Sequence, residues 1–160
     1  LRLLVFWTLG SVGGANWSTL MPATVAMLAA LLWLLRLARP LDAMALGEDD
    51  ATHLGIDVAK LKRSAALATA VGVGAAVSVT GTIGFIGLVT PHLVRLAAGP
   101  SHRQVLLGSA LLGAALLLLA DLVARFAVAP AELPLGVVTA LIGAPFLIGL
   151  LSRRRDALAG

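Results

Sequence analysis

The sequence predicts an all-α protein, a polytopic bundle of transmembrane helices. Two observations carry this prediction: 59% of the 160 residues are hydrophobic and only 12% are charged. A soluble domain of this length would need polar faces on its helices, and the long apolar runs leave none. Cysteine is absent, which excludes disulfides, thiolate nucleophiles and zinc–thiolate sites.

Four nearly uncharged runs supply the membrane segments, and they cover residues 16–35, 64–94, 104–120 and 133–152. About 20 apolar residues cross a bilayer core of roughly 30 Å, so the first and last runs are predicted to be single spans. The third run extends through Val128 if Asp121 and Arg125 are admitted. The second run is too long for one span, because a straight helix over it would reach about 46 Å.

Glycines mark the place where the second run is expected to break. Gly81, Gly84 and Gly87 lie near its middle, with Pro91 following. Loop charge favours two helices over one long tilted helix, because only two helices bring all the loop cations to one side of the membrane. We therefore predict helices over 60–80 and 84–97, giving about five membrane segments and a cytoplasmic C-terminus. The cations are Arg36, Arg39, Lys60, Lys62, Arg63, Arg95, Arg103, Arg153, Arg154 and Arg155.

One acidic loop, residues 45–57, interrupts the apolar sequence. Leu41, Met44, Ala45 and Leu46 are expected to form a short helix that Asp42 caps and Gly47 ends. Glu48, Asp49 and Asp50 are expected in the first turn of a second short helix, which Gly55 ends, and Asp57 is placed to cap the next membrane helix. Capping explains most of this acidity. It does not explain two short helices with exposed apolar side chains, which favour docking against a partner.

Asp121 and Arg125 form an ionisable pair within an apolar helix. They lie four residues apart with the acid first, which is the favourable order for pairing on one helix face. Charges inside a membrane often mark functional sites. Simple pairing, with Arg125 reaching toward the outer interface, and a docking or pathway role both remain open.

Catalytic and nucleic-acid functions find little support. The net charge is +4, but the cations fall in loops between apolar runs, as in membrane proteins, so nucleic acid is not expected as a partner. No protease, hydrolase or nucleotide-binding motif is present, and His53, His92 and His102 lack metal-ligand spacing. A transport permease, a membrane enzyme and a structural or assembly subunit remain as hypotheses, and the enzyme lacks convergent catalytic groups.

Several long stretches closely resemble the FecCD-type permeases, the membrane subunits of ABC importers for iron-siderophore complexes, haem and vitamin B12. The resemblance covers the C-terminal half of a usual member, so residues 1–160 are expected to be the C-terminal part of a single permease domain whose N-terminal spans are absent. The matching stretches are "VFWTLGSVGGANW", "ARPLDAMALGEDDATHLGIDV", "GTIGFIGLVTPHLVRLAAGPSHRQVLLGSALLGAALLLLADLVAR" and "PAELPLGVVTALIGAPFLIGLLSRR".

The resemblance implies a role for each candidate site. It places Arg125 against acidic residues of a periplasmic or lipoprotein substrate-binding protein, and Gly81, Gly84, Gly87 and Pro91 at a helix break in the substrate pathway. It implies a homodimer or heterodimer in the bacterial inner membrane, with ATP bound only by a partner subunit and no cofactor in the permease. A truncated, non-transporting structural subunit is the alternative. The implied surface for the cytoplasmic ATPase comprises Leu46, Gly47, Glu48, Asp49, Asp50, His53, Leu54 and Gly55.

Overall fold

The structure, a computed structural model, describes residues 10, 16–127, 135–141, 143–145 and 148–149. Helix is the regular structure throughout this part of the chain, as predicted. A shorter apolar helix, Leu135–Pro145, follows the labelled helices. Residues 128–134, the cations Arg153, Arg154 and Arg155, and most of the stretch before Asn16 lie outside the described residues. The labelled helices are α2 (Trp17–Met44), α3 (Glu48–His53), α4 (Val58–Thr80), α5 (Ile86–Ala98) and α6 (His102–Ala127).

Within the described residues, three helices, α2, α4 and α6, are long and apolar enough to cross a membrane. The long second run is divided between α4 and α5, as loop charge predicted, at nearly the predicted boundaries. Of these two, α4 has the length of a full span, whereas the 13 residues of α5 cover only about 20 Å. Because α5 does not cross alone, it depends on its neighbours to cover its backbone ends.

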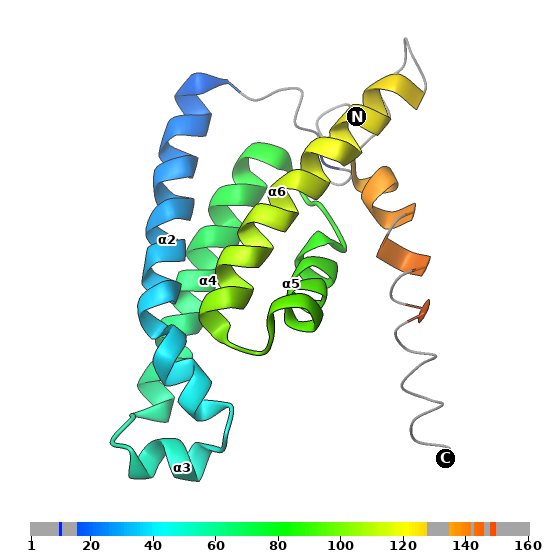
Figure 1. Ribbon diagram of the computed structural model, residues 1–160. Helices are drawn as coiled ribbons and strands as arrows, with labels where there is room; N and C mark the ends of the chain where they lie inside the picture. Colours follow the sequence, from blue (N-terminus) through cyan, green and yellow to red (C-terminus); the bar gives the residue numbers. More distant parts are fainter. Residues whose placement is uncertain (1–9, 11–15, 128–134, 142, 146–147, 150–160) are drawn as a thin grey trace.

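α2 runs toward the end of the bundle beyond which α3 lies, α4 and α6 both run away from that end, and the short α5 runs back toward it between them (Figure 1). The helices α2 and α4 pack side by side, and α5 packs against α6. Small residues line the α2–α4 contact: Ala30 and Ala68 are buried, and a Cβ on Gly72 would lie 3.2 Å from the Cβ of Ala30. Small side chains at these three positions let the two backbones approach closely, as in other membrane bundles.

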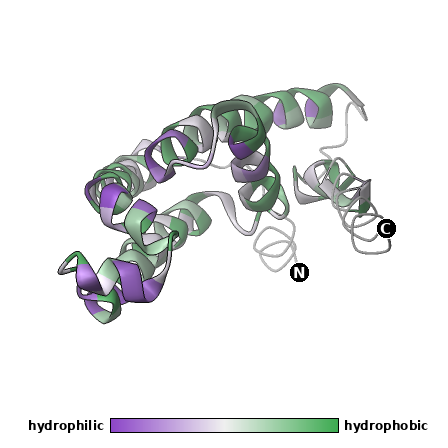
Figure 2. Cartoon of the chain, turned by 60° about the horizontal axis from the view of Figure 1, so that its bottom comes forward, coloured by the Kyte–Doolittle hydropathy of each residue, from purple (hydrophilic) through white to green (hydrophobic). Residues whose placement is uncertain are grey.

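The outer surface of the bundle is apolar. Leu111, Leu118 and Phe126 on α6 are each more than 70% exposed. Figure 2 shows hydrophobic residues along most of the helices, with hydrophilic ones gathered most densely around α3. A surface of this kind is stable only when lipid or another apolar protein surface covers it.

The break between α4 and α5 occupies residues 81–85. Gly81 ends α4 with a φ of +68°, and Phe85 precedes α5 with a φ of +67°, which is unusual for a residue with a Cβ. The expectation that Gly87 and Pro91 belong to the break is wrong, since both lie inside α5. Proline there removes one N–H from the helix, and the remaining bonds carry α5 on to Ala98.

Candidate functional site

The segment between α2 and α4, residues 45–57, projects beyond the membrane-length helices, and we call it the α3 loop (Figure 1). Leu46 and Leu54 are 79% and 70% exposed, so two large apolar side chains face outward from a polar region. Gly47 joins α2 to α3 with a φ of +154°. A surface with these features is suited to docking against a protein partner.

The first half of the α3 loop differs from the prediction of a separate short helix. No separate short helix forms around Leu41 and Met44, because α2 continues through Met44 and Pro40 is accommodated within it. The amide of Ala45 donates to the carbonyl of Leu41 at 3.1 Å, and that of Gly47 donates to Met44 at 3.2 Å. The chain from Leu41 to Gly47 is therefore one hydrogen-bonded continuation of α2.

The second half of the loop matches its prediction. Glu48, Asp49 and Asp50 occupy the first turn of α3, where carboxylates interact favourably with the helix dipole. Lys62 of α4 pairs with Glu48, which ties α3 to the following membrane helix. His53 is the last residue of α3, and Gly55 follows with a φ of +81°.

Asp57 caps α4, as its position in the sequence predicted. Its carboxylate accepts a hydrogen bond from the Lys60 amide at 3.0 Å, and the Lys60 ammonium lies 3.0 Å from the other carboxylate oxygen. The backbone hydrogen bond is the main cause that lowers the pKa of Asp57 below its ordinary value.

The capping hydrogen bond of Asp57 should be detectable in a pH titration followed by NMR. A carboxylate whose pKa is lowered by folding stabilises the folded state at any pH above its unfolded pKa. This stabilisation is lost as the pH falls through the folded pKa. We expect the Lys60 amide resonance to shift with a midpoint below about 3.9, the ordinary aspartate value. Asp57→Asn is the control, since its amide oxygen still accepts the bond but does not titrate. A midpoint at or above the ordinary value would contradict the assignment.

The predicted ion pair of Asp121 and Arg125 forms near the C-terminal end of α6. The Arg125 Nε donates to Asp121 Oδ2 at 2.8 Å, and the two side chains are 58% and 27% exposed. About 35 Å of helix separates Arg125 from the start of α6, which lies at the α3 end of the bundle. The structure therefore places Arg125 and the α3 loop toward opposite ends of the molecule.

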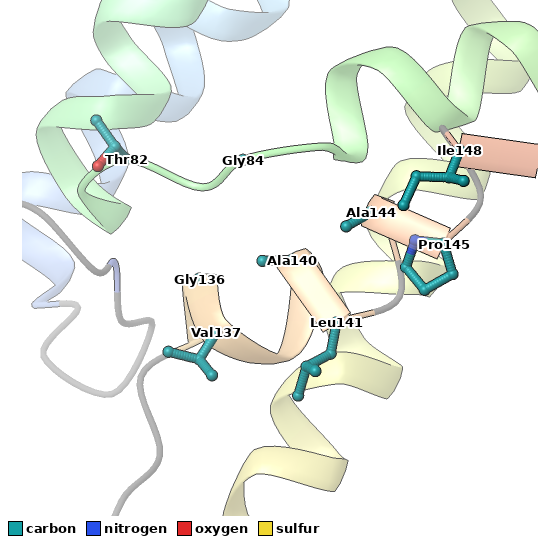
Figure 3. A pocket seen from close by; sticks show the side chains of 9 residues that line it. All are labelled: Thr82, Gly84, Gly136, Val137, Ala140, Leu141, Ala144, Pro145 and Ile148. Atoms are coloured by element: carbon teal, nitrogen blue, oxygen red, sulfur yellow. The ribbon is translucent and has the colours of Figure 1, made fainter. Parts of the chain in front are cut away.

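An open cavity of about 710 Å³ lies between the α4–α5 break and the helix Leu135–Pro145 (Figure 3). Thr82 and Gly84 line it from the break, and Val137 and Leu141 are among the apolar residues that line it from the helix. Gly84 thus lines the cavity, and Gly81 directly precedes Thr82, which also lines it. Gly87 and Pro91 are not among the residues that line it.

Sequence reasoning missed a polar contact that joins two helices at the α3 end. Asp42 does not cap a helix of its own; its Oδ1 lies 2.7 Å from both the backbone N and the Nδ1 of His102, and Oδ2 lies 3.4 Å from the Ser101 hydroxyl. One signal was present in the sequence. A carboxylate near the C-terminal end of a helix meets the negative end of the dipole, which favours a compensating partner elsewhere.

Residues 1–153 match the model of the FecCD transport family. The chain belongs to the FecCD transport family. Its FecCD relatives include the hemin transport system permease protein HmuU of Yersinia pestis, which is 46% identical over the whole of this chain and 48% of its own length. The vitamin B12 import system permease protein BtuC of Vibrio parahaemolyticus is 48% identical over 98% of this chain and 47% of its own length.

A solved structure gives the same fold. It is described as an inward-facing conformation of an ABC transporter of the metal-chelate type, and it matches with a TM-score of 0.86 and 38% identity. The match covers 96% of this chain and 49% of the solved one. The chain thus spans about half the length of the FecCD relatives it matches. Family membership confirms the resemblance noted in the sequence, and the fold agrees with the predicted helical membrane bundle.

Proposed function

We propose that this chain is part of the membrane-spanning permease of an ABC importer, and that it helps to translocate an iron-siderophore, haem or cobalamin-type substrate into the cell. Residues 1–160 would form the C-terminal part of one permease domain. FecCD membership supports this proposal, as do the haem and vitamin B12 permeases among the relatives. The observation that carries it is the α3 loop, where Leu46 and Leu54 stand exposed beyond the ends of apolar, membrane-length helices.

The charges at the α3 end support a sidedness. Arg39, Lys60, Arg95 and Arg103 all lie in or near the connections at this end of the bundle. Because cytoplasmic loops carry an excess of lysine and arginine, this end would face the cytoplasm of a bacterial cell with the protein in its inner membrane. The C-terminus would be cytoplasmic as well.

The α3 loop would be the surface that a cytoplasmic ATPase subunit contacts. Its exposed leucines suit an apolar groove, and its short helix is held to α4 by the Lys62–Glu48 pair. ATP would bind to the ATPase subunit and be hydrolysed there. The resulting movement of the ATPase would be passed to the permease through the α3 loop. The proposed contact residues are Leu46, Gly47, Glu48, Asp49, Asp50, His53, Leu54 and Gly55.

The cavity beside the α4–α5 break would face the substrate pathway. Its lining is apolar apart from Thr82, and it is open to one side, which suits a second permease copy in a homodimer or heterodimer. Gly81 and Gly84 would shape this region directly. Gly87 and Pro91 would act only by setting the course of α5.

Arg125 would contact a substrate-binding protein at the outer face. We expect Arg125→Glu to weaken docking of the binding protein by roughly ten-fold, because a rim charge reversal replaces attraction with repulsion of acidic partner residues. Basal ATP hydrolysis by the complete transporter should change little. The measurement is the binding affinity for the binding protein in nanodiscs at two salt concentrations.

Arg103→Glu is the matched control, since it makes the same charge change on the same helix at the opposite end. It should leave binding-protein affinity unchanged. Equal effects from the two variants, or none from Arg125→Glu, would refute the docking role of Arg125.

An uptake assay tests the proposed function as a whole. Proteoliposomes would hold the complete transporter, meaning the full-length permease dimer with its ATPase and binding protein, and each would receive haem, cobalamin or a ferric siderophore. We expect ATP-dependent accumulation of one of the three. A complex that assembles but accumulates none of them would favour the structural or assembly role over transport.

A further inference from the structure

Asp42 makes a polar link between α2 and the start of α6, two helices that also pack against each other. It lies in the last turn of α2, two residues before the helix ends at Met44. His102 begins α6, and the connection of residues 99–101 joins it to the end of α5. One carboxylate thus links the end of α2 to the turn between α5 and α6, across about sixty residues of sequence.

The contact caps the N-terminal end of α6 and gives a carboxylate at the C-terminal end of α2 its polar partners. The first N–H groups of α6 have no partner within their own helix, and Asp42 accepts the one from His102 at 2.7 Å. The negative charge of Asp42 is unfavourable at the C-terminal end of α2 and favourable at the N-terminal end of α6. The Nδ1 of His102 and the Ser101 hydroxyl also reach the same carboxylate. Three polar groups of one turn therefore converge on a single side chain.

The α3 loop and Asp42 are mechanically continuous. Ala45, Leu46 and Gly47 each donate a backbone hydrogen bond to the last residues of α2, at 3.1 to 3.2 Å. A force applied at Leu46 would therefore act on the last turn of α2, which carries Asp42. On the other side of the contact, α5 packs mainly against α6 and leads back to the break that borders the cavity.

We propose that Asp42 is a positioning residue that carries movement of the α3 loop to the turn between α5 and α6. This inference rests on the proposed function, because it assumes that an ATPase moves the α3 loop. Asp42 acts through Ser101 and His102 and contacts no substrate. Through this link, displacement of the loop would shift α5, and with it the wall of the cavity at Gly84.

A coupling measurement tests the role of Asp42 in the complete transporter. We expect Asp42→Ala to lower the substrate transported per ATP hydrolysed by about ten-fold, the scale of losing charge-assisted hydrogen bonds. Basal ATP hydrolysis and the yield of assembled complex should be retained. Asp42→Asn should restore most of the ratio, because its amide oxygen still accepts the His102 N–H.

Asp57→Ala is the matched control, because Asp57 ends the α3 loop but is not among the proposed contact residues of the ATPase. It also removes a capping carboxylate at the α3 end, but the cap it removes is local to α4. The ratio should therefore stay near that of the native chain. Equal losses from the alanine variants at both positions would mean a general effect of lost caps and would overturn the proposal.

A distance measurement tests the link without relying on transport. Residues 1–160 contain no cysteine, so once any cysteines elsewhere in the complete transporter are replaced, spin labels can be attached at Thr52→Cys on α3 and Pro100→Cys on the α5–α6 connection. One permease copy of each complex would carry both labels, in the absence of ATP. We expect a narrow distance distribution in the native background, a broad one with Asp42→Ala, and a narrow one again with Asp42→Asn.

The outcomes separate the two proposals. A native complex that transports nothing overturns the proposed function, while the label distances still report on the link. Active transport with an unchanged ratio in Asp42→Ala overturns the positioning role. Distance distributions that are the same in all three backgrounds overturn it as well.

Discussion

Gly47→Pro in the complete transporter is expected to reduce ATP-driven uptake by about ten-fold or more, because proline holds φ near −65° and removes an N–H. Gly47 has a φ of +154°, and its amide donates to the Met44 carbonyl. The turn between α2 and α3 must therefore rearrange, which displaces Leu46 from its position. Uptake and ATP hydrolysis would be measured together in proteoliposomes, and we expect hydrolysis to continue without transport.

A second variant separates coupling from misfolding of the turn. Leu46→Arg places a charge on a side chain that is 79% exposed, so it should leave the fold intact and still uncouple the ATPase. Leu46→Met is the matched control and should transport normally, because it retains an apolar side chain of similar size. Full uptake by both Gly47→Pro and Leu46→Arg would refute the assignment of the α3 loop as the coupling surface.

Gly108→Ala is expected to destabilise the packing of α5 on α6. A Cβ at Gly108 would lie 2.6 Å from the Val94 Cγ1 and 3.1 Å from its Cγ2, and Val94 is buried. Overpacking of this kind typically costs about 1–3 kcal/mol. The measurement is thermal unfolding of the permease in detergent, where the variant should unfold at a lower temperature than the native protein.

Val94→Ala in the same chain supplies the rescue. It removes both atoms that the new Cβ would meet, so the double variant should be more stable than the sum of the single effects predicts. Gly74→Ala is the control, since nothing lies within 4 Å of its Cβ position. Strict additivity of the two substitutions would show that the close approach of Gly108 to Val94 does not limit stability.

The predictions that succeeded rest on local features of the chain. The capping bond of Asp57 joins residues three apart, and the Asp121–Arg125 pair joins residues four apart, so helix geometry alone brings them together. The division of the long apolar run into α4 and α5 followed from the distribution of loop cations. That distribution depends on which side of the membrane each loop faces and needs no knowledge of packing.

The predictions that failed concern where a helix stops. α2 continues through Pro40 to Met44, although a separate short helix was predicted there, and Pro91 lies inside α5 rather than in the break to which it was assigned. A single proline costs a helix one hydrogen bond, and packing of the helix against its neighbours can offset that loss. Phe85 shares a positive φ with Gly81 at the break, which no sequence pattern predicted.

The sequence by itself determined that this protein is a helical membrane bundle, where its apolar run divides, and which acidic loop stands apart from the membrane. Those properties follow from hydrophobicity, charge and spacings of a few residues. Only the tertiary structure decided that Asp42 reaches across to His102, that Gly108 faces Val94, and that Gly84 borders a cavity. These contacts join residues that are at least 14 positions apart in the sequence. No local pattern encodes them, because they depend on how whole helices pack.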